Sequence, residues 1–312
     1  MCLRSTMEAM SQPTIAPVPE PQWREALALV FSHLEPGQQR RQLEGILSAA
    51  NQQPQTLACL LGAWRGERLV GAALAQVQAG RTAMVWPPGL APGESPPTAD
   101  GLLAAICDWL SSQGVRLAQS LLGDAATAQH DILERHGFRH LADLLYLVSG
   151  TEEAVSVSPG CALRFVEYNP QFAGRLAAVV KQTYQDTLDC PALNGVQAIE
   201  DVLAGYRATG VFRPQWWLII QHERRDVGCL LLADHPQQGN VELVYMGLVP
   251  HARGRGWGLQ IVRHAQWLAR LAGRQHLVAA VDAANQPALR VYARAGFDVW
   301  ERRAAFVRIF PL

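Results

Sequence analysis

The sequence lacks a charge excess, a cysteine pair and a long apolar run. Its 312 residues carry 27 basic and 27 acidic side chains, so the basic face typical of nucleic-acid or membrane-surface binding is not expected. The six cysteines are scattered without a C-x-x-C pair, and the nine histidines show no H-E-x-x-H spacing, so neither a disulfide framework nor a metal site is expected.

The same absences bear on location. No stretch approaches the roughly 20 apolar residues that a membrane span requires. The first 20 residues lack the apolar segment of a secretory signal and contain three prolines without periodicity. We therefore expect a cytoplasmic protein without a membrane partner, beginning with a flexible leader over residues 1–20.

An internal repeat organises the rest of the chain. Two segments 159 residues apart both read as a short helix closed by glycine and followed by a strand: Ile132–Phe138 and Val291–Phe297. A glycine after the last helical turn suits a left-handed C-cap. An offset of about half the chain indicates a duplicated domain rather than a solenoid, whose period is shorter.

Each half also shows the same order of elements. Two helices are followed by three strands, a long helix, a strand, a short helix and a last strand, and in the second half an additional strand near 161–167 precedes the helices. The Gly- and Ser-containing run 149–160 is expected to join the halves. We predict an α+β protein with two tandem domains, 21–150 and 161–312, each a mixed, mostly antiparallel sheet flanked by helices.

One segment combines a strand, a glycine-rich basic turn and the start of a helix. The strand is expected over 241–249 and the helix over about 256–272; the turn reads Arg253-Gly254-Arg255-Gly256-Trp257-Gly258. Glycines allow positive φ, and successive N–H groups at a helix N-terminus bind phosphate. A plain glycine turn with solvated arginines is the alternative. The Walker G-K-[ST] is missing, and antiparallel strands rather than a βαβ unit precede the turn.

These residues resemble the GCN5-related N-acetyltransferase (GNAT) superfamily. Its pyrophosphate loop, [Q/R]-x-x-G-x-[G/A], is matched in full by 253–258, and its later Asn–Tyr–Gly-Phe pattern is matched by Asn285, Tyr292, Gly296 and Phe297. The resemblance covers about 161–312 well. The first half matches only in element order and in its Gly137-Phe138 ending, so the chain resembles a tandem acetyltransferase, an arrangement also known in mycothiol synthase.

The resemblance implies a set of cofactor contacts. Acetyl-CoA would be the co-substrate, with its pyrophosphate held by the main chain of the loop and its pantetheine arm paired with the strand through Met246, which a bulge splays from its neighbour. A main-chain N–H near Met246 would polarise the thioester carbonyl. The implied cofactor-binding residues are Met246, Gly247, Leu248, Arg253, Gly254, Arg255, Gly256, Trp257, Gly258, Leu259 and Asn285, with the arginines adding steering charge.

Two residues are predicted to be catalytic. Glu242 lies fourteen residues before Gly256, the spacing of the glutamate base in family members that acetylate histones. Strand alternation places Glu242 on the face of Val244 and Met246 unless a bulge intervenes; a salt-bridged strand glutamate is the alternative. Tyr292 would protonate the leaving thiolate, and its alternative is a core aromatic whose hydroxyl finds another partner.

The segment between the first two helices of the second half is the expected acceptor wall. Asp186 and Asp189 could attract a cationic amine, with Tyr184 and Cys190 as further contacts. A polar interhelical loop is the alternative. No histidine lies near Cys190 in sequence, and the superfamily transfers the acyl group directly, so Cys190 is treated as a substrate contact rather than a nucleophile.

The first half is predicted to be a degenerate copy. Its counterpart of the phosphate loop, 86–97, contains five prolines, which lack N–H donors, and Glu94 adds negative charge where a phosphate would lie. At the same 159-residue offset, Leu133 replaces Tyr292 and Ala126 replaces Asn285.

The sequence therefore predicts an N-acetyltransferase acting on a small-molecule or peptide amine, with its site in the second half. A longer acyl-CoA, or a non-catalytic acyl-CoA-binding role, are the alternatives. The acceptor and the oligomeric state stay open, because many acceptors share one fold.

Overall fold

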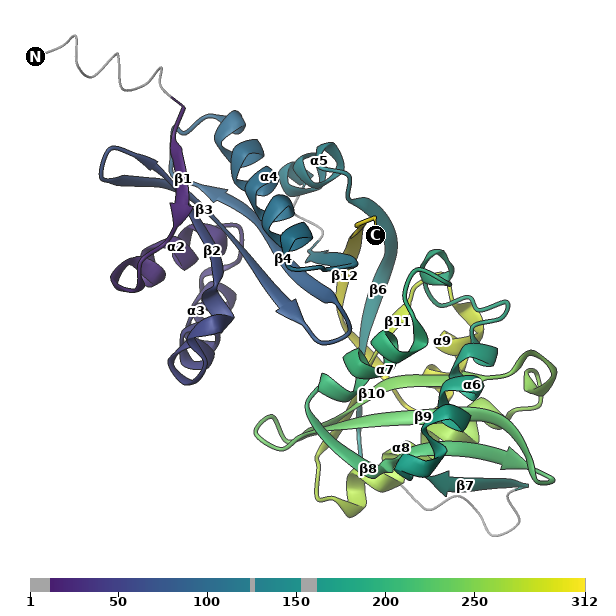
Figure 1. The fold of residues 1–312 in the computed structure, drawn as a ribbon. Helices are drawn as coiled ribbons and strands as arrows, with labels where there is room; N and C mark the ends of the chain where they lie inside the picture. Colours follow the sequence, from purple (N-terminus) through teal and green to yellow (C-terminus); the bar gives the residue numbers. More distant parts are fainter. Residues whose placement is uncertain (1–11, 124–126, 153–161, 312) are drawn as a thin grey trace, which may run out of the picture. The chain divides into compact units, whose positions relative to one another are not determined.

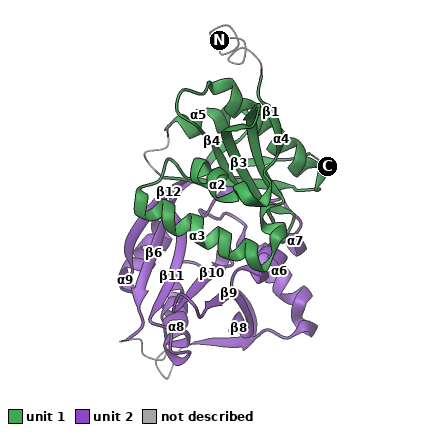
Figure 2. Ribbon diagram, turned by 90° about the vertical axis from the view of Figure 1, so that its left-hand side faces the viewer, with its two compact units in different colours: residues 1–140, 305–312 green, residues 141–304 purple. Residues whose placement is uncertain are grey.

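The chain divides into two compact units (Figure 2). The computed structural model describes residues 12–123, 127–152 and 162–311. Unit 1 comprises residues 1–140 and 305–312, and unit 2 comprises residues 141–304. Within the described ranges, no helix is both long and apolar enough to cross a membrane.

Unit 1 is a sheet covered by helices on both faces (Figure 1). Its strand order is β1-β2-β3-β4-β5, followed by the end of β12; neighbours are antiparallel from β1 to β4, whereas β4 and β5 are parallel. The elements are β1 (Thr14–Pro17), α2 (Trp23–Val30), α3 (Pro36–Gln52), β2 (Cys59–Arg65), β3 (Arg68–Gln78), β4 (Thr82–Leu90), α4 (Pro96–Ser112), β5 (Leu117–Leu122) and α5 (Thr127–Arg135).

The apolar core of unit 1 lies on both faces of its central strand, β3. Seven consecutive residues of β3 are buried, because helices cover both of its faces. Ala72 and Leu74 share an apolar cluster with α2, whereas a side chain at Gly71 would meet Leu102 of α4.

Unit 2 repeats this plan. Its strand order is β7-β8-β9-β10-β11-β6, followed by the start of β12. One face carries α6 and α7, and the other carries the cluster that includes the buried residues of α8. The elements are β6 (Arg139–Gly150), β7 (Leu163–Glu167), α6 (Ala173–Thr183), α7 (Ile199–Ala208), β8 (Val211–His222), β9 (Arg225–His235), β10 (Asn240–Leu248), α8 (Trp257–Leu271), β11 (His276–Asp282), α9 (Gln286–Arg294) and β12 (Asp298–Ile309).

The predicted duplication is confirmed at the end of each half. The bounds of α5 and β6 reappear 159 residues later as those of α9 and β12. Gly137 and Gly296 both have positive φ, 78° and 80°, as the glycine C-caps require.

The two copies exchange their last strands. The sequence analysis assigned the strand after Phe138 to the first half, but β6 pairs antiparallel with β11, from Gly150 opposite His276 to Leu144 opposite Asp282. Conversely, residues 305–309 of β12 belong to unit 1. Because the copies are alike, each final strand can pair with either copy's open edge, and the local pattern does not distinguish the two.

The structure differs from two further expectations. Thr14–Pro17, placed in the flexible leader, form β1, because their main chain pairs antiparallel with β2. The expected phosphate-loop counterpart 86–97 begins inside β4, which continues to Leu90; its prolines at 87 and 88 lie at a register shift where ladder N–H groups are not required. Residues 1–11, Ala126 and 153–161 of the predicted join lie outside the described residues.

Candidate active site

The strands β10 and β11 separate in the middle of unit 2. They run parallel and pair only from Asn240 opposite His276 to Leu243 opposite Ala279. A register shift between Leu243 and Tyr245 marks a bulge in β10, which confirms the predicted bulge, and β10 then continues to pair with β9 up to Leu248. Main-chain groups on the other edge of 245–248 therefore face the opening rather than a strand.

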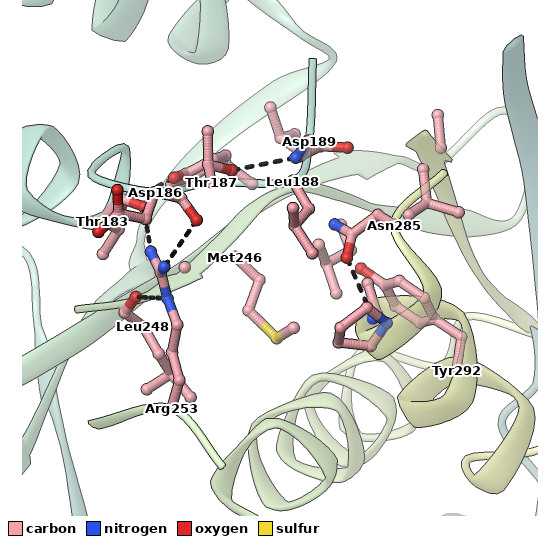
Figure 3. A pocket seen from close by; sticks show the side chains of 18 residues that line it. Thr183, Asp186, Thr187, Leu188, Asp189, Met246, Leu248, Arg253, Asn285 and Tyr292 are labelled. Atoms are coloured by element: carbon pink, nitrogen blue, oxygen red, sulfur yellow. Dashed lines mark hydrogen bonds between the residues drawn. The ribbon is translucent and has the colours of Figure 1, made fainter. Parts of the chain in front are cut away.

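A cavity of about 200 Å³ lies at this opening (Figure 3). Met246 and Tyr292 reach it from opposite sides, from β10 and α9. The volume suits the reacting ends of two substrates rather than a whole nucleotide cofactor. The lining comprises Thr183, Asp186, Thr187, Leu188, Asp189, Leu243, Val244, Tyr245, Met246, Gly247, Leu248, Arg253, Ala280, Val281, Asn285, Pro287, Ala288 and Tyr292.

Tyr292 is a buried phenol at the edge of this cavity. Its side chain is only 5% exposed, and its ring packs edge-on against Phe297 at 5.2 Å between centroids. Burial raises its pKa, and the negative charge of Asp189 raises it further. The hydroxyl therefore keeps its proton at neutral pH, the state that a general acid requires.

Asn285 positions the helix that carries Tyr292. Its carboxamide oxygen accepts a hydrogen bond from the main-chain N–H of Ala288 at 3.3 Å and so caps α9. Asn285 also lines the cavity.

The glycine turn before α8 has the geometry of an anion site. Gly254 and Gly256 have φ values of 77° and 75°, and a Cβ at either would meet open space. The N-cap residue of α8 is Gly256, which has no side chain that could take up the first N–H groups of the helix. These features fit a pyrophosphate.

The neighbours of these glycines divide into exposed and packed positions. Arg255 is exposed, with its guanidinium 5.2 Å from the ring centre of Trp257. Trp257 is a core residue of α8 at 8% exposure, and Gly258 and Leu259 continue the first turn of that helix.

Arg253 is bonded to main-chain carbonyls at the ends of β10 and α6. Its guanidinium donates to the carbonyl oxygens of Leu248 at 3.0 Å and Asp186 at 2.9 Å, and to those of Thr183 and Gln185 at 2.9 and 2.7 Å. These bonds give the side chain a structural role, and its steering of the cofactor stays a prediction.

Glu242 lies on a different face from the one expected. The bulge puts it in phase with Tyr245, whereas Met246 packs on the cluster of the α8 face. Its carboxylate is 3.0 Å from Nε2 of His235, and it is outside the described set of cavity-lining residues. Its role as base stays a prediction.

The expected acceptor wall is partly at the cavity. Asp186 and Asp189 line it, whereas among the described residues Tyr184 and Cys190 do not. The Tyr184 hydroxyl lies 2.9 Å from that of Tyr206, and burial raises its pKa to about 12. Burial, then the charges of Asp189 and Asp282, raise the pKa of the Cys190 thiol to about 12, which opposes nucleophilic catalysis.

Three residues at the site went unassigned in the sequence. Thr183 packs so closely on β10 that a Cβ at Gly247 would lie 2.6 Å from its Cβ. The hydroxyls of Thr183 and Tyr245 lie 2.7 Å apart. Asp282, 6% exposed at the end of β11, accepts from the Cys190 N–H at 3.3 Å, and its own N–H donates to Asp189 at 3.2 Å. A polar residue at the end of a strand beside the opening was the available signal for Asp282.

In unit 1 the corresponding helix end holds a side chain. The carboxylate of Glu94 receives hydrogen bonds from Arg65 at 2.8 and 2.9 Å, from the Ser95 N–H at 2.9 Å and from the Thr98 hydroxyl at 2.7 Å. The Arg65 bonds are the largest cause of the lowered pKa of Glu94. An internal anion thus occupies the N-terminus of α4, where unit 2 leaves α8 uncapped.

The sequence model of the acetyltransferase (GNAT) family matches residues 182–297, a segment that lies within unit 2. A search of curated protein sequences gave no match.

Solved structures share the fold of nearly the whole chain. A GCN5-related N-acetyltransferase from Sphaerobacter thermophilus has a TM-score of 0.64 at 14% identity, over 95% of each chain. A tandem GNAT protein from the clavulanic acid biosynthesis pathway has a TM-score of 0.54 at 12% identity, over 96% of this chain and 99% of that one. A glucosamine N-acetyltransferase region of a fungal β-N-acetylglucosaminidase has a TM-score of 0.61 at 13% identity, over 96% of this chain and 38% of that one.

Proposed function

We propose that unit 2 transfers an acetyl group from acetyl-CoA to an amine by direct attack. The observation that carries the proposal is the cavity at the opening between β10 and β11, which is lined by Arg253 of the glycine turn, by 246–248 of β10 and by Tyr292. Acetyl-CoA supplies the acetyl thioester. The loop 254–259 would hold its pyrophosphate, the free main-chain edge of 246–248 its pantetheine arm, and Asn285 would contact it at the cavity.

Two groups of the chain would handle the thioester. A main-chain N–H at the free edge of β10 near Met246 would donate to the carbonyl oxygen as negative charge develops on it. The Tyr292 hydroxyl, kept protonated by burial, would give its proton to the departing sulfur.

Asp189 is a second carboxylate to weigh beside Glu242 as proton acceptor. The residue is exposed as a whole but lines the cavity, and its carboxylate accepts a hydrogen bond from the Asp282 N–H at 3.2 Å; burial, and then the charge of Asp282, raise its pKa. A raised pKa makes a carboxylate a better base for an ammonium, whose ordinary pKa is about 10.4. Glu242 could act only on an acceptor that extends along its own face of the sheet.

Release of free thiol from acetyl-CoA in the presence of a panel of primary amines tests the proposal. We expect turnover that disappears in Gly256→Asp, because a carboxylate there would fill and repel the phosphate site. Longer acyl-CoA thioesters, run in parallel, test the acyl length. Cofactor binding without thiol release for any amine would support the non-catalytic alternative.

Glu242→Gln and Asp189→Asn separate the two bases. The variant that removes the base should lower kcat most at low pH, with acetyl-CoA affinity nearly unchanged. A wild-type pH–rate profile in Glu242→Gln removes Glu242 from that role, and the same result in Asp189→Asn removes Asp189.

A further inference from the structure

One part of the unit 2 sheet is left open next to the cavity. On the face of α6 and α7, these helices pack on β8, β9 and Tyr245 of β10. On the same face of β11, Val278 is only partly buried and Ala280 is exposed, and Ala280 also lines the cavity. The open face is therefore continuous with the proposed active site.

Two aromatic side chains extend this face away from the cavity. Tyr146 of β6 stands directly opposite Ala280 in the ladder. Its ring contacts that of Trp300 of β12 edge-on, with centroids 5.8 Å apart, and Trp300 is 58% exposed. Because adjacent strands lie about 4.8 Å apart, Trp300 is about two strand spacings from the cavity edge.

Charged groups hold Tyr146 in this position. The guanidinium of Arg303 lies 5.4 Å from the centre of its ring, and Arg303 donates to Glu301 at 2.8 Å. Glu242 stands opposite Val278 in the β10–β11 ladder, so its carboxylate borders the same face. A positively charged ligand with a flat apolar part would meet aromatic surface and negative charge together.

The strand that carries Tyr146 comes from the first half of the sequence. β6 ends at Gly150, inside the join predicted at 149–160, yet it supplies the strand beside β11. A single exposed aromatic needs no explanation, whereas an aromatic pair continuous with a cavity is typical of a binding surface.

We propose that Tyr146 and Trp300 form an acceptor subsite that binds the flat, apolar ring of an amine whose amino group enters the cavity past Ala280. This inference rests on the proposed function and narrows it to ring-bearing amines. The first half of the chain thereby contributes a specificity residue to the site in unit 2.

The experiment compares two amines, 4-phenylbutylamine and butylamine, in the thiol-release assay with the full chain; the four-carbon chain is long enough to carry the ring past Ala280 towards Trp300. The wild type should favour 4-phenylbutylamine in kcat/KM. Trp300→Ala should lower kcat/KM for 4-phenylbutylamine about tenfold and leave butylamine within about twofold, because only the larger amine reaches the Trp300 ring. Val299→Ala, an equally exposed neighbour at 56%, is the matched control.

Tyr146→Leu adds a second variant that keeps an apolar residue in β6. Equal losses for both amines, or a wild type that favours butylamine, would overturn the subsite. Ligand-observed NMR of 4-phenylbutylamine with the wild type and Trp300→Ala measures binding without turnover. Equal binding by both proteins also overturns the subsite, and weaker binding by the variant supports it. Absence of both acetyl-CoA binding and thiol release instead removes the proposed function.

Discussion

The guanidinium of Arg253 donates a hydrogen bond to the main-chain carbonyl of Thr183 over 2.9 Å and so ties the glycine turn before α8 to the end of α6. With its bonds to 185 and 186, this one side chain satisfies carbonyls that a helix end leaves without partners. The segment that follows, 186–189, lines the cavity. Arg253 therefore couples the expected acceptor wall to the expected cofactor loop.

Arg253→Ala should destabilise the protein and raise the KM for the amine. Hydrogen bonds from a charged donor contribute about 1.5–3 kcal/mol, so we expect a loss of about 2 kcal/mol or more in the free energy of unfolding. The exposed Arg255→Ala should change stability by less than about 0.5 kcal/mol and weaken acetyl-CoA binding instead. Urea unfolding and calorimetry measure both; intact stability with weakened cofactor binding in Arg253→Ala would show that this side chain serves the cofactor.

Tyr292→Phe should lower kcat about 10²- to 10³-fold and leave acetyl-CoA affinity unchanged, because only the proton donor is lost. The raised pKa of Tyr292 also predicts that wild-type kcat does not fall from its deprotonation up to about pH 10. Tyr184→Phe is the control. The Tyr184 hydroxyl lies beside that of Tyr206, and Tyr184 is not among the cavity-lining residues given above. Similar losses in both variants would indicate a packing role.

Glu94→Ala should destabilise unit 1 by about 3 kcal/mol, because Arg65 and the end of α4 lose their buried anion. Added sulfate should recover part of the loss by occupying the same donors. The pKa of Glu94 is lowered in the fold, so its stabilisation is present above about pH 4.5 and is lost as pH falls towards the folded pKa. Glu44→Ala removes an exposed pair with Arg24 and should have little effect; equal effects would contradict the account.

His264 should make stability depend on pH. It stacks on Phe165 at 3.8 Å, and burial lowers its pKa to about 4 from an ordinary 6.5. Between pH 6.5 and 4, His264 is protonated in the unfolded chain but not in the folded one. The free energy of unfolding is therefore unaffected above about pH 6.5 and falls by about 2–3 kcal/mol towards pH 4. His264→Phe keeps the stack and should flatten this slope in urea unfolding, whereas the exposed His276→Gln should not. An unchanged slope in His264→Phe would refute the assignment.

Local signals predicted the second half of the sheet and its helices well. The short helix closed by Gly296 is present as α9, Gln286–Arg294, because Asn285, Pro287 and Gly296 mark its start and end within one short segment. The turn at Gly254 and Gly256 was also recognisable from local sequence, because glycine adopts the positive φ that both positions have.

Nonlocal relationships could not be predicted in the same way. The sequence of β6 is that of a half-buried strand, which suits the open edge of either copy. Its pairing with β11 is therefore seen only in the structure. Three of the four main-chain carbonyls that Arg253 bonds lie 67 to 70 residues earlier, and main-chain partners cannot be recognised from the pattern of side chains. The face of the sheet on which Glu242 lies depends on one bulge at Val244. A single extra residue in a strand moves every residue before it to the opposite face.

Calorimetric titration of the full chain with acetyl-CoA, with desulfo-CoA in parallel, tests the central claim most directly. We predict one site per chain, lost in Gly256→Asp and retained in Glu94→Ala, because unit 2 offers an uncapped helix N-terminus and unit 1 fills its own with Glu94. Two sites, or a single site that survives Gly256→Asp, would contradict the assignment of the cofactor to unit 2.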